Sequence, residues 1–337
     1  MLFLIQGFEH PASRYRVLQY LDVLRASGVE DKVVRYPENR SRWRALAGDL
    51  AESDIVFVQK KRLKPRHARF IRRCGPAKIV YDFDDAVMFK SSRAKSRRSR
   101  KRMSAFVRMC EASDFVIAGN GYLEQMAREH NANTAIVPTS INTDLYPERK
   151  AQETDSITLG WIGGRKSLVF LRELAPVLEE IHGQHPKARL KIVCNDFFDL
   201  SRMPVVRKEW SEAEEGADVA SFDIGLAPLP DDPWSRGKCA TKLLQCMAAG
   251  VPCVASAVGV HKEIIKEGEN GFLGGTPEEW REALSRLCSD AGLRSALGRK
   301  ARETVERDYS LRSSAPKLLE ILKKNTGTGE EAREVRR

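Results

Sequence analysis

The 337-residue chain lacks several features that would settle its class at once. It has no apolar run near the roughly 20 residues that span a bilayer, so we expect no transmembrane helix. Its seven cysteines form no C-x-x-C pair, which argues against a zinc ribbon or a disulfide framework. No Ser-His-Asp order, H-E-x-x-H motif or Walker loop is present, and the six histidines are isolated. The MLFLIQG start has no basic leader, so we expect no signal peptide and a cytoplasmic location.

Charge is unevenly distributed along the chain. The net charge is +11, yet residues 1–150 hold 29 Lys and Arg against 17 Asp and Glu, whereas residues 151–337 hold 28 against 29. A basic half and a nearly neutral half indicate two domains with different partners. We expect the first half to face something anionic: a membrane surface, a phosphorylated substrate or a nucleic acid.

Apolar runs alternate with helical patterns in both halves, which predicts an α/β protein with parallel sheets. In the first half the runs expected to form strands are 2–5, 54–59, 78–83, 115–120 and 134–139. In the second half they are 157–164, 189–196, 222–229, 252–259 and 271–275. The polar stretch 148–156 is the expected linker. The tail 325–337 lacks a core face and is expected to be disordered.

The residues that follow each apolar run are the first candidates for a site, because open α/β sheets bind ligands beyond the carboxyl ends of their strands. Gly163, Gly164, Arg165 and Lys166 follow one such run and lead into a predicted helix. Glycines let a phosphate approach the backbone, and two cations at a helix N-terminus would bind its charge. A tight turn with solvent-facing cations fits the same residues, so both interpretations stay open.

A second candidate lies on the predicted helix 240–249. On a helical wheel at ~100° per residue, Lys238, Lys242 and Gln245 fall within about 60° of one another, and the rest of the helix is apolar. Two cations and an amide fit a diphosphate and a ribose. The alternative is a surface helix whose lysines extend to solvent.

A third candidate is YDFDDA (81–86), at the end of a predicted strand. Asp82 and Asp84 form a D-x-D, a pattern that can hold a metal-bound nucleotide. Three carboxylates in four positions could equally cap a helix. We expect a functional role for Asp84 or Asp85 and no metal site.

The fourth candidate is the basic run KSSRAKSRRSRKR (90–102). From Lys60 to Arg108 there are 18 Lys and Arg against three Asp and Glu, with few aromatic residues among them. The shortage of aromatic side chains for stacking argues against single-stranded nucleic acid. An anionic lipid surface, at ~1 kcal/mol for each basic residue, fits better. A solvated loop is the alternative.

Several stretches together resemble the retaining glycosyltransferases of the GT-B class, family four. The specific one is DIGLAPLPDDPWSRGKCATKLLQCMAAGVPCVASAVG (223–259); the supporting ones are 14–30, 79–89, 114–127, 160–164 and 269–280. The resemblance implies two facing Rossmann-like domains with a cleft between them. It implies an acceptor and membrane-facing domain (1–150), a nucleotide-sugar donor domain (151–310) and a C-terminal helix (311–324) that crosses back to the first domain.

The resemblance also implies roles for individual residues. The donor would be bound by Gly163, Gly164, Arg165, Lys166, Arg236, Lys238, Lys242, Leu243 and Gln245. Asp84, Asp85 and Lys242 would be catalytic, and Arg14, Arg16 and Asn120 would lie on the acceptor side. The chain departs from the family where Gly237 and Gln245 replace its two usual glutamates. Gln245 matches the one that holds the ribose, so we expect Gln245→Glu to be tolerated.

The sequence therefore predicts a metal-independent, cytoplasmic glycosyltransferase of polysaccharide biosynthesis, possessing no cofactor and peripheral to the membrane. It would move a sugar from a nucleotide-diphosphate sugar to a hydroxyl of a cell-surface glycan or lipid-linked acceptor, with retention. One alternative is a degenerate relative that binds nucleotide sugars without turnover. The other is a nucleic-acid-binding protein that uses residues 60–108.

Overall fold

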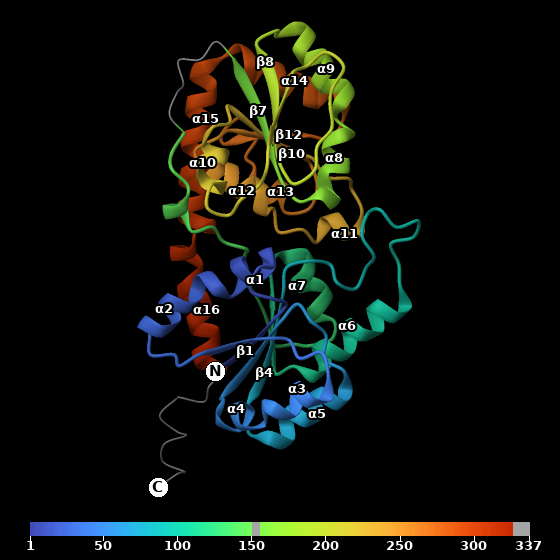
Figure 1. Ribbon diagram of the computed structural model, residues 1–337, viewed down its shortest axis with the longest axis vertical. Helices are drawn as coiled ribbons and strands as arrows, with labels where there is room; N and C mark the ends of the chain where they lie inside the picture. Colours follow the sequence, from blue (N-terminus) through green and yellow to red (C-terminus); the bar gives the residue numbers. More distant parts are fainter. Residues whose placement is uncertain (150–155, 326–337) are drawn as a thin grey trace. The chain divides into compact units, whose positions relative to one another are not determined.

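The computed structural model describes residues 1–149 and 156–325, which form two compact units (Figure 1). The first unit comprises residues 1–140, 232–239 and the chain from residue 311. The second comprises residues 141–231 and 240–310. Most of the predicted linker and nearly all of the predicted disordered tail lie outside the described residues.

The first unit is built on a six-stranded, fully parallel sheet with the order β2-β1-β3-β4-β5-β6. Its strands are β1 (Leu2–Ile5), β2 (Lys32–Arg35), β3 (Ile55–Gln59), β4 (Lys78–Phe83), β5 (Phe115–Ala118) and β6 (Thr134–Ile136). The central strands β1, β3 and β4 are almost entirely buried because helices cover both faces of the sheet. The α/β class predicted from the alternating runs is confirmed.

The helices of the first unit divide between the two faces of its sheet. They are α1 (Pro11–Arg16), α2 (Leu21–Ala26), α3 (Arg40–Ala45), α4 (Ala47–Glu52), α5 (Pro65–Cys74), α6 (Arg100–Ala112), α7 (Gly121–Arg128) and α16 (Leu311–Asn325). Ala315, Leu318 and Leu322 of α16 pack with Phe3 and Phe57 of the sheet. Helix α16, the last one that the structure describes, is therefore part of the first unit.

A short segment from the second half of the chain, residues 232–239, also belongs to the first unit. It contains the single-turn helix α11 (Pro233–Arg236). Asp232 accepts hydrogen bonds from Ser92 and Arg97, and the Asn120 amide donates to the carbonyl oxygen of Lys238 at 3.1 Å. This segment therefore belongs to the first unit, although it lies inside the predicted donor domain (151–310).

The second unit repeats the plan with the strand order β12-β11-β10-β7-β8-β9, again fully parallel. Its strands are β7 (Ile157–Ile162), β8 (Ala188–Val193), β9 (Val205–Lys208), β10 (Ile224–Ala227), β11 (Cys253–Ser256) and β12 (Gly271–Gly274). The unit starts before the predicted boundary at residue 150, because Ile141 forms a bridge with Ser310. Each unit is a Rossmann-like α/β domain.

The helices of the second unit flank its sheet in the same way. They are α8 (Leu168–Arg172), α9 (Ala175–Gln184), α10 (Glu215–Ala220), α12 (Thr241–Ala248), α13 (His261–Ile264), α14 (Pro277–Ser289) and α15 (Ala291–Thr304). Two helices, α8 and α9, follow β7, and Pro176 lies in the first turn of α9. Within residues 1–149 and 156–325, no helix is both long enough and apolar enough to cross a bilayer.

Candidate functional sites

Four charged side chains meet at the carboxyl edge of the first sheet. Lys60 follows β3, Asp84 and Asp85 follow β4, and Lys238 comes from the segment 232–239. Lys60 Nζ lies 2.9 Å from Asp84 Oδ1 and also contacts Asp85. Lys238 Nζ lies 2.7 Å from Asp85 Oδ1. Two cations and two anions thus form a balanced cluster, which we call the lysine–aspartate cluster.

Three members of the cluster are only slightly exposed, and the charges of the four stabilise one another. The side chains of Lys60, Asp84 and Asp85 are 13–15% exposed. Burial acts to raise the pKa of Asp85, but Lys238 and Lys60 outweigh it and lower the pKa to about 2. Burial likewise acts to lower the pKa of Lys60, and Asp84 and Asp85 reverse that effect and raise it. Both aspartates are consequently held in place by ammonium groups.

The backbone is strained at Lys60, within this cluster, and at Ala240 in the second unit. Lys60 has φ +60° and Ala240 has φ +56°, and they are the two non-glycine residues with positive φ in the described part of the chain. This left-handed conformation costs an L-residue roughly 1–2 kcal/mol. It is retained where surrounding contacts fix it, often at functional positions. Lys60 was not among the predicted site residues, and no sequence pattern reveals its conformation.

Close packing explains the glycine at position 237. A Cβ placed on Gly237 would lie 2.6 Å from Ala86 Cβ and 2.9 Å from Leu123 Cδ2. No larger residue fits without moving this backbone, so a glutamate is sterically excluded here. The neighbouring Ala86 directly follows Asp85, so the lysine–aspartate cluster lies beside the place where the family's first glutamate would project.

The residues predicted for the acceptor side have different surroundings. Arg16 is buried, pairs with Asp82 through a forked contact and donates to the carbonyl oxygen of Val137 at 2.6 Å. Arg16 thus takes part in an ion pair inside the first unit. Asn120 is also buried; it caps α7 and binds the segment 232–239. Arg14 is partly exposed and lies over the ring of Tyr15.

In the second unit, Lys242 extends from α12 along the end of β7. Its Nζ donates to Ser167 Oγ at 2.6 Å and lies 4.8 Å from the centre of the Trp161 ring. A Cβ on Gly163 would approach Lys242 Cε to 2.5 Å, so glycine at 163 provides the space for this side chain. The structure therefore brings together the glycine pair and the helix lysine, which the sequence suggested separately.

The other residues predicted to bind the donor differ in their exposure and in their partners. Arg165 is 80% exposed and pairs with Asp196 across 2.9 Å, and Lys166 is exposed. The Leu243 side chain is fully buried, so only its backbone can contact a ligand. Arg236 and Lys238 belong to the segment 232–239 of the first unit. Within that unit Lys238 binds Asp85.

The first turn of α12 adds an anion-binding element beside Lys242. Its first N–H groups have no acceptor within the helix. Ala240, at the N-cap position, makes no capping hydrogen bond through its side chain. The backbone N–H groups of Lys242 and Leu243 therefore lie at the positive end of the helix dipole, where a phosphate is stabilised.

His261, one of the six isolated histidines, lies near Lys242. It is buried at the start of α13, and its Nδ1 lies 3.0 Å from the carbonyl oxygen of Ser256. Burial, with the charge of Lys242 as a smaller contribution, lowers its pKa to about 4. His261 is thus neutral at physiological pH and adds no charge to the site.

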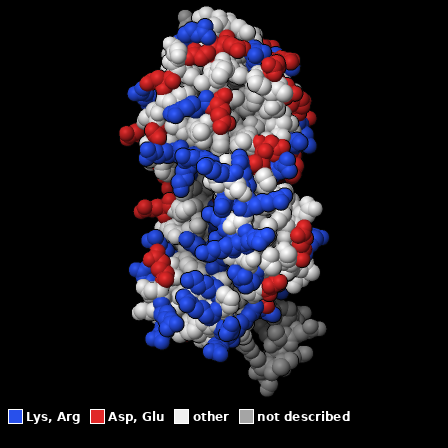
Figure 2. Space-filling model, turned by 90° about the vertical axis from the view of Figure 1, so that its right-hand side faces the viewer, with Lys and Arg blue, Asp and Glu red and all other residues white. Residues whose placement is uncertain are grey.

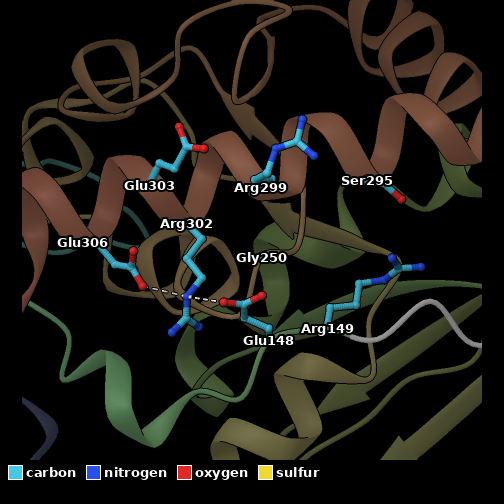
Figure 3. A pocket seen from close by; sticks show the side chains of 8 residues that line it. All are labelled: Glu148, Arg149, Gly250, Ser295, Arg299, Arg302, Glu303 and Glu306. Carbon is cyan, nitrogen blue, oxygen red and sulfur yellow. Dashed lines mark hydrogen bonds and ion pairs between the residues drawn. The ribbon is translucent and has the colours of Figure 1, made fainter.

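A cavity of about 240 Å³ lies elsewhere in the second unit, between α15 and residues 148–149 (Figure 3). Three of its lining side chains are arginines and three are glutamates. Arg302 lies between Glu148 and Glu306 and also donates to the carbonyl oxygens of Tyr146 and Ala248. The positive and negative side chains that line this cavity balance one another. The lining therefore gives no reason to expect a charged ligand there.

Basic side chains crowd the surface of the first unit (Figure 2). The exposed ones on α5 and α6 are Arg66, Arg69, Arg72, Arg73, Arg100, Lys101, Arg102 and Arg108. Two cations of the predicted 90–102 run have partners within the unit: Arg97 binds Asp232, and Arg102 donates to the carbonyl oxygen of Phe89 at 2.8 Å. Arg72 of α5 also pairs with Asp114, at 2.7 Å, so the helices and the loop both contribute exposed positive charge to this surface.

Comparison with known families decides the class of the second unit. Residues 159–290 match the family "Glycosyl transferases group 1". These residues form a glycosyl transferases group 1 domain. The match covers β7 to the end of α14, including Gly163, Lys242 and Gln245, and it confirms the resemblance seen in the sequence.

Curated relatives of this glycosyltransferase domain match over short stretches. The spore coat protein SA of Bacillus subtilis is 32% identical over 84 residues, which are 24% of this chain and 22% of that protein. A D-inositol 3-phosphate glycosyltransferase of Corynebacterium urealyticum is 35% identical over 80 residues, 23% of this chain and 19% of that protein. The chain spans less than a third of the length of these relatives.

Solved structures match nearly the whole chain at low identity. A sucrose-phosphate synthase from Thermosynechococcus elongatus has a TM-score of 0.74 at 16% identity and covers 97% of this chain and 99% of its own. Anabaena HepE, solved in complex with UDP and glucose, has a TM-score of 0.69 at 13% identity and covers 96% and 99%. These likenesses confirm the predicted GT-B fold.

Proposed function

We propose that this protein is a retaining glycosyltransferase that uses a nucleotide-diphosphate sugar. The observation that carries the proposal is the position of Lys242: glycine at 163 makes room for it, and Ser167 and Trp161 hold it at the sheet's ligand edge. Its place inside a glycosyl transferases group 1 domain supports a sugar donor as the ligand. The HepE complex makes UDP the first nucleotide to test.

In this proposal the second unit holds the donor. Lys242 and the first-turn N–H groups of α12 bind the diphosphate, with Arg165 and Lys166 as exposed outer cations. Charge accumulates on the diphosphate as the glycosidic bond breaks. Preorganised cations and N–H groups stabilise that charge more than they stabilise the bound substrate, which lowers the barrier. Lys242 is the catalytic residue of this step.

The first unit supplies the acceptor-side groups. Asp84 and Asp85 would orient a sugar or acceptor hydroxyl, and Lys60 and Lys238 hold the two carboxylates in place. A divalent cation would have to displace these ammonium groups, so we propose a reaction that needs no metal. Activity should survive excess EDTA, and a loss that Mn²⁺ reverses would contradict this part.

The acceptor is proposed to be a cell-surface glycan precursor, or another acceptor linked to lipid, at the inner face of a membrane. The cationic surface of α5 and α6 supports this, since each basic residue near an anionic bilayer contributes ~1 kcal/mol. In this proposal the protein acts in polysaccharide biosynthesis and is peripheral to the membrane.

A degenerate, binding-only relative is the second candidate, and Gly237 is the observation that favours it. Position 237 has no space for the carboxylate that active family members carry there. The test is a panel of UDP-, GDP- and dTDP-sugars. Thermal stabilisation is read first, because a ligand at 100 times its Kd adds about 2.7 kcal/mol. Transfer to a lipid-linked acceptor is read second.

Thermal stabilisation and sugar transfer together distinguish the two candidate functions. Stabilisation together with transfer supports the glycosyltransferase. Stabilisation without transfer or donor hydrolysis supports the binding protein. No stabilisation by any member of the panel contradicts both.

A further inference from the structure

His10 lies between β1 and α1, close enough to the lysine–aspartate cluster to be affected by its charges. The backbone N–H of Ala12 donates to His10 Nδ1 at 3.2 Å, so His10 caps α1. Since Nδ1 is the acceptor, the proton of the neutral ring is on Nε2. Burial and the charge of Lys60 lower the pKa of His10 below its ordinary value of 6.5, although Asp84 and Asp85 act to raise it. His10 therefore presents a neutral Nε2–H group at physiological pH.

Asp84 has one carboxylate oxygen in an ion pair and one without a partner. Its Oδ1 lies 2.9 Å from Lys60 Nζ and is buried. Among the residues that the structure describes, no side chain and no backbone N–H group donates to Oδ2. The side chain is 13% exposed, and because Oδ1 is buried this exposure belongs to its other atoms. Oδ2 is consequently the oxygen of Asp84 that can accept from a ligand.

The two groups make opposite demands on a ligand. The Nε2–H of His10 only donates a hydrogen bond, and a carboxylate oxygen such as Asp84 Oδ2 only accepts one. A hydroxyl group does both, because it has one proton and two lone pairs. An ionised phosphate can only accept, and an ammonium group can only donate. The pair of His10 and Asp84 therefore matches a ligand that is rich in hydroxyl groups.

The charges around the two groups favour a neutral ligand. Lys60 and Lys238 balance the two aspartates, and neutral His10 adds no charge. Glu9 and Lys61, both exposed, follow the same balance with one charge of each sign. A phosphate would have to take Lys60 or Lys238 from its aspartate and would then face an unpaired carboxylate. A sugar hydroxyl requires no such exchange.

An exposed aromatic ring lies two residues before His10. The His10 backbone N–H donates to the carbonyl oxygen of Gly7 at 3.2 Å, and this bond closes a turn with Phe8 and Glu9 in its middle. The Phe8 side chain is 56% exposed. The face of an aromatic ring carries partial negative charge, which suits the C–H groups on the apolar face of a pyranose. The turn thus adds an apolar surface to the hydrogen-bonding groups.

We propose that the first unit binds the acceptor through a neutral sugar ring. Asp84 Oδ2 accepts from one hydroxyl of that ring, His10 Nε2–H donates to a sugar oxygen, and Phe8 packs against the apolar face. This inference rests on the proposed function and narrows its acceptor to a glycan that ends in an uncharged sugar. A bare phosphate, a phosphorylated sugar and an amine are excluded as the group bound at this position.

Binding of small probes to the full chain, without a donor, tests the inference. The probes are the methyl glycosides of glucose, galactose, mannose and N-acetylglucosamine, with inorganic phosphate and ethylammonium as charged competitors. Saturation-transfer NMR gives the Kd of each glycoside. The variants are His10→Asn and Phe8→Ser. Asparagine still caps α1, but its shorter side chain has no donor at the place of Nε2. Glu9→Gln is the matched control, because Glu9 is exposed in the same turn.

We expect at least one glycoside to bind and neither phosphate nor ethylammonium to displace it. His10→Asn and Phe8→Ser should each raise the Kd of that glycoside about fivefold to tenfold, with the Tm within a few degrees of the unaltered protein. Glu9→Gln should leave the Kd within about twofold. The proposal is overturned if no glycoside binds, if phosphate displaces the glycoside, or if His10→Asn and Glu9→Gln have the same Kd.

Failure of the proposed function gives a different result. In that case UDP, GDP and dTDP would all leave the Tm unchanged, and a bound glycoside would receive no sugar from any nucleotide-sugar donor. The Kd values are measured without a donor, so they would still show whether His10 and Phe8 bind a sugar. A glycoside that binds through these residues but is never glycosylated would support the sugar site and reject the transferase.

Discussion

Lys242 occupies the space that a side chain at position 163 would need. A Cβ on Gly163 would lie 2.5 Å from Lys242 Cε and 2.7 Å from its Nζ, whereas a Cβ on Gly164 would meet nothing within 4 Å. Gly163→Ala should therefore displace the ammonium group from Ser167 and lower kcat by about tenfold or more. Gly164→Ala is the matched control and should retain most of the activity. Similar kinetics for the two variants would contradict the account.

The charge balance of Asp85 predicts a dependence of stability on pH. Its pKa is about 2 in the folded protein, below the ordinary value of 3.8, because Lys238 and Lys60 outweigh burial. A depressed carboxyl pKa contributes stability that is present above pH 4 and is lost as the pH falls toward 2. Asp85→Asn should be less stable than the unaltered protein at pH 7, and the difference should shrink between pH 4 and pH 2.

Chemical denaturation across that pH range measures the effect. Asp22→Asn is the control, because the Asp22 side chain is 97% exposed. A constant difference between Asp85→Asn and the unaltered protein from pH 7 to pH 2 would show that the Asp85 charge does not stabilise the fold.

The packing around Gly237 predicts that the family's usual glutamate cannot be restored there. Gly237→Glu should destabilise the protein and should not raise turnover, because even a Cβ would clash with Ala86 and Leu123. Gly48→Ala is the control in the same unit, since a Cβ at Gly48 meets nothing within 4 Å. Thermal melting and initial rates measure both effects. A stable Gly237→Glu enzyme with higher kcat would refute this interpretation.

Much of the fold follows from the sequence because buried strands are short apolar runs. All ten runs expected to form strands do so, most of them shorter at their ends by two or three residues. Strands β2 and β9 were missed because they lie at sheet edges and are only partly buried. Helix α6 begins inside the basic run 90–102, where charge masks the helical pattern.

Less of the candidate sites than of the fold could be predicted from the sequence. The prediction that Lys238, Lys242 and Gln245 share one stripe required a continuous helix. In the structure α12 begins at Thr241, and Lys238 lies in the segment before it. Lys60 was missed because its partners are distant in the sequence. Pairings such as Lys60 with Asp84 depend on tertiary packing, which no local pattern encodes.

The cationic surface predicts binding to anionic liposomes that depends on particular residues. Changing Arg98, Arg100 and Lys101 to serine should weaken binding by about 3 kcal/mol at low salt and leave UDP-induced stabilisation intact. Arg97→Ser should weaken it less and instead lower the Tm, because Arg97 binds Asp232. Sedimentation with vesicles containing phosphatidylserine separates the two effects. Equal liposome binding by the triple variant and the unaltered protein would reject the membrane-facing surface.

The central claim is that Lys242 binds and stabilises the donor diphosphate, and Lys242→Ala tests it most directly. Lys242 Nζ contacts the Ser167 hydroxyl and the Trp161 ring, and we expect the fold to depend little on these two contacts. The Tm without ligand should therefore change by at most a few degrees. Removing one donor from a preorganised site costs about 10²–10³ in kcat. Lys300→Ala, at an exposed lysine on α15, is the control. The account predicts a folded Lys242→Ala protein that UDP stabilises weakly and that transfers sugar at least a hundredfold more slowly. A folded variant with nearly normal turnover would contradict it.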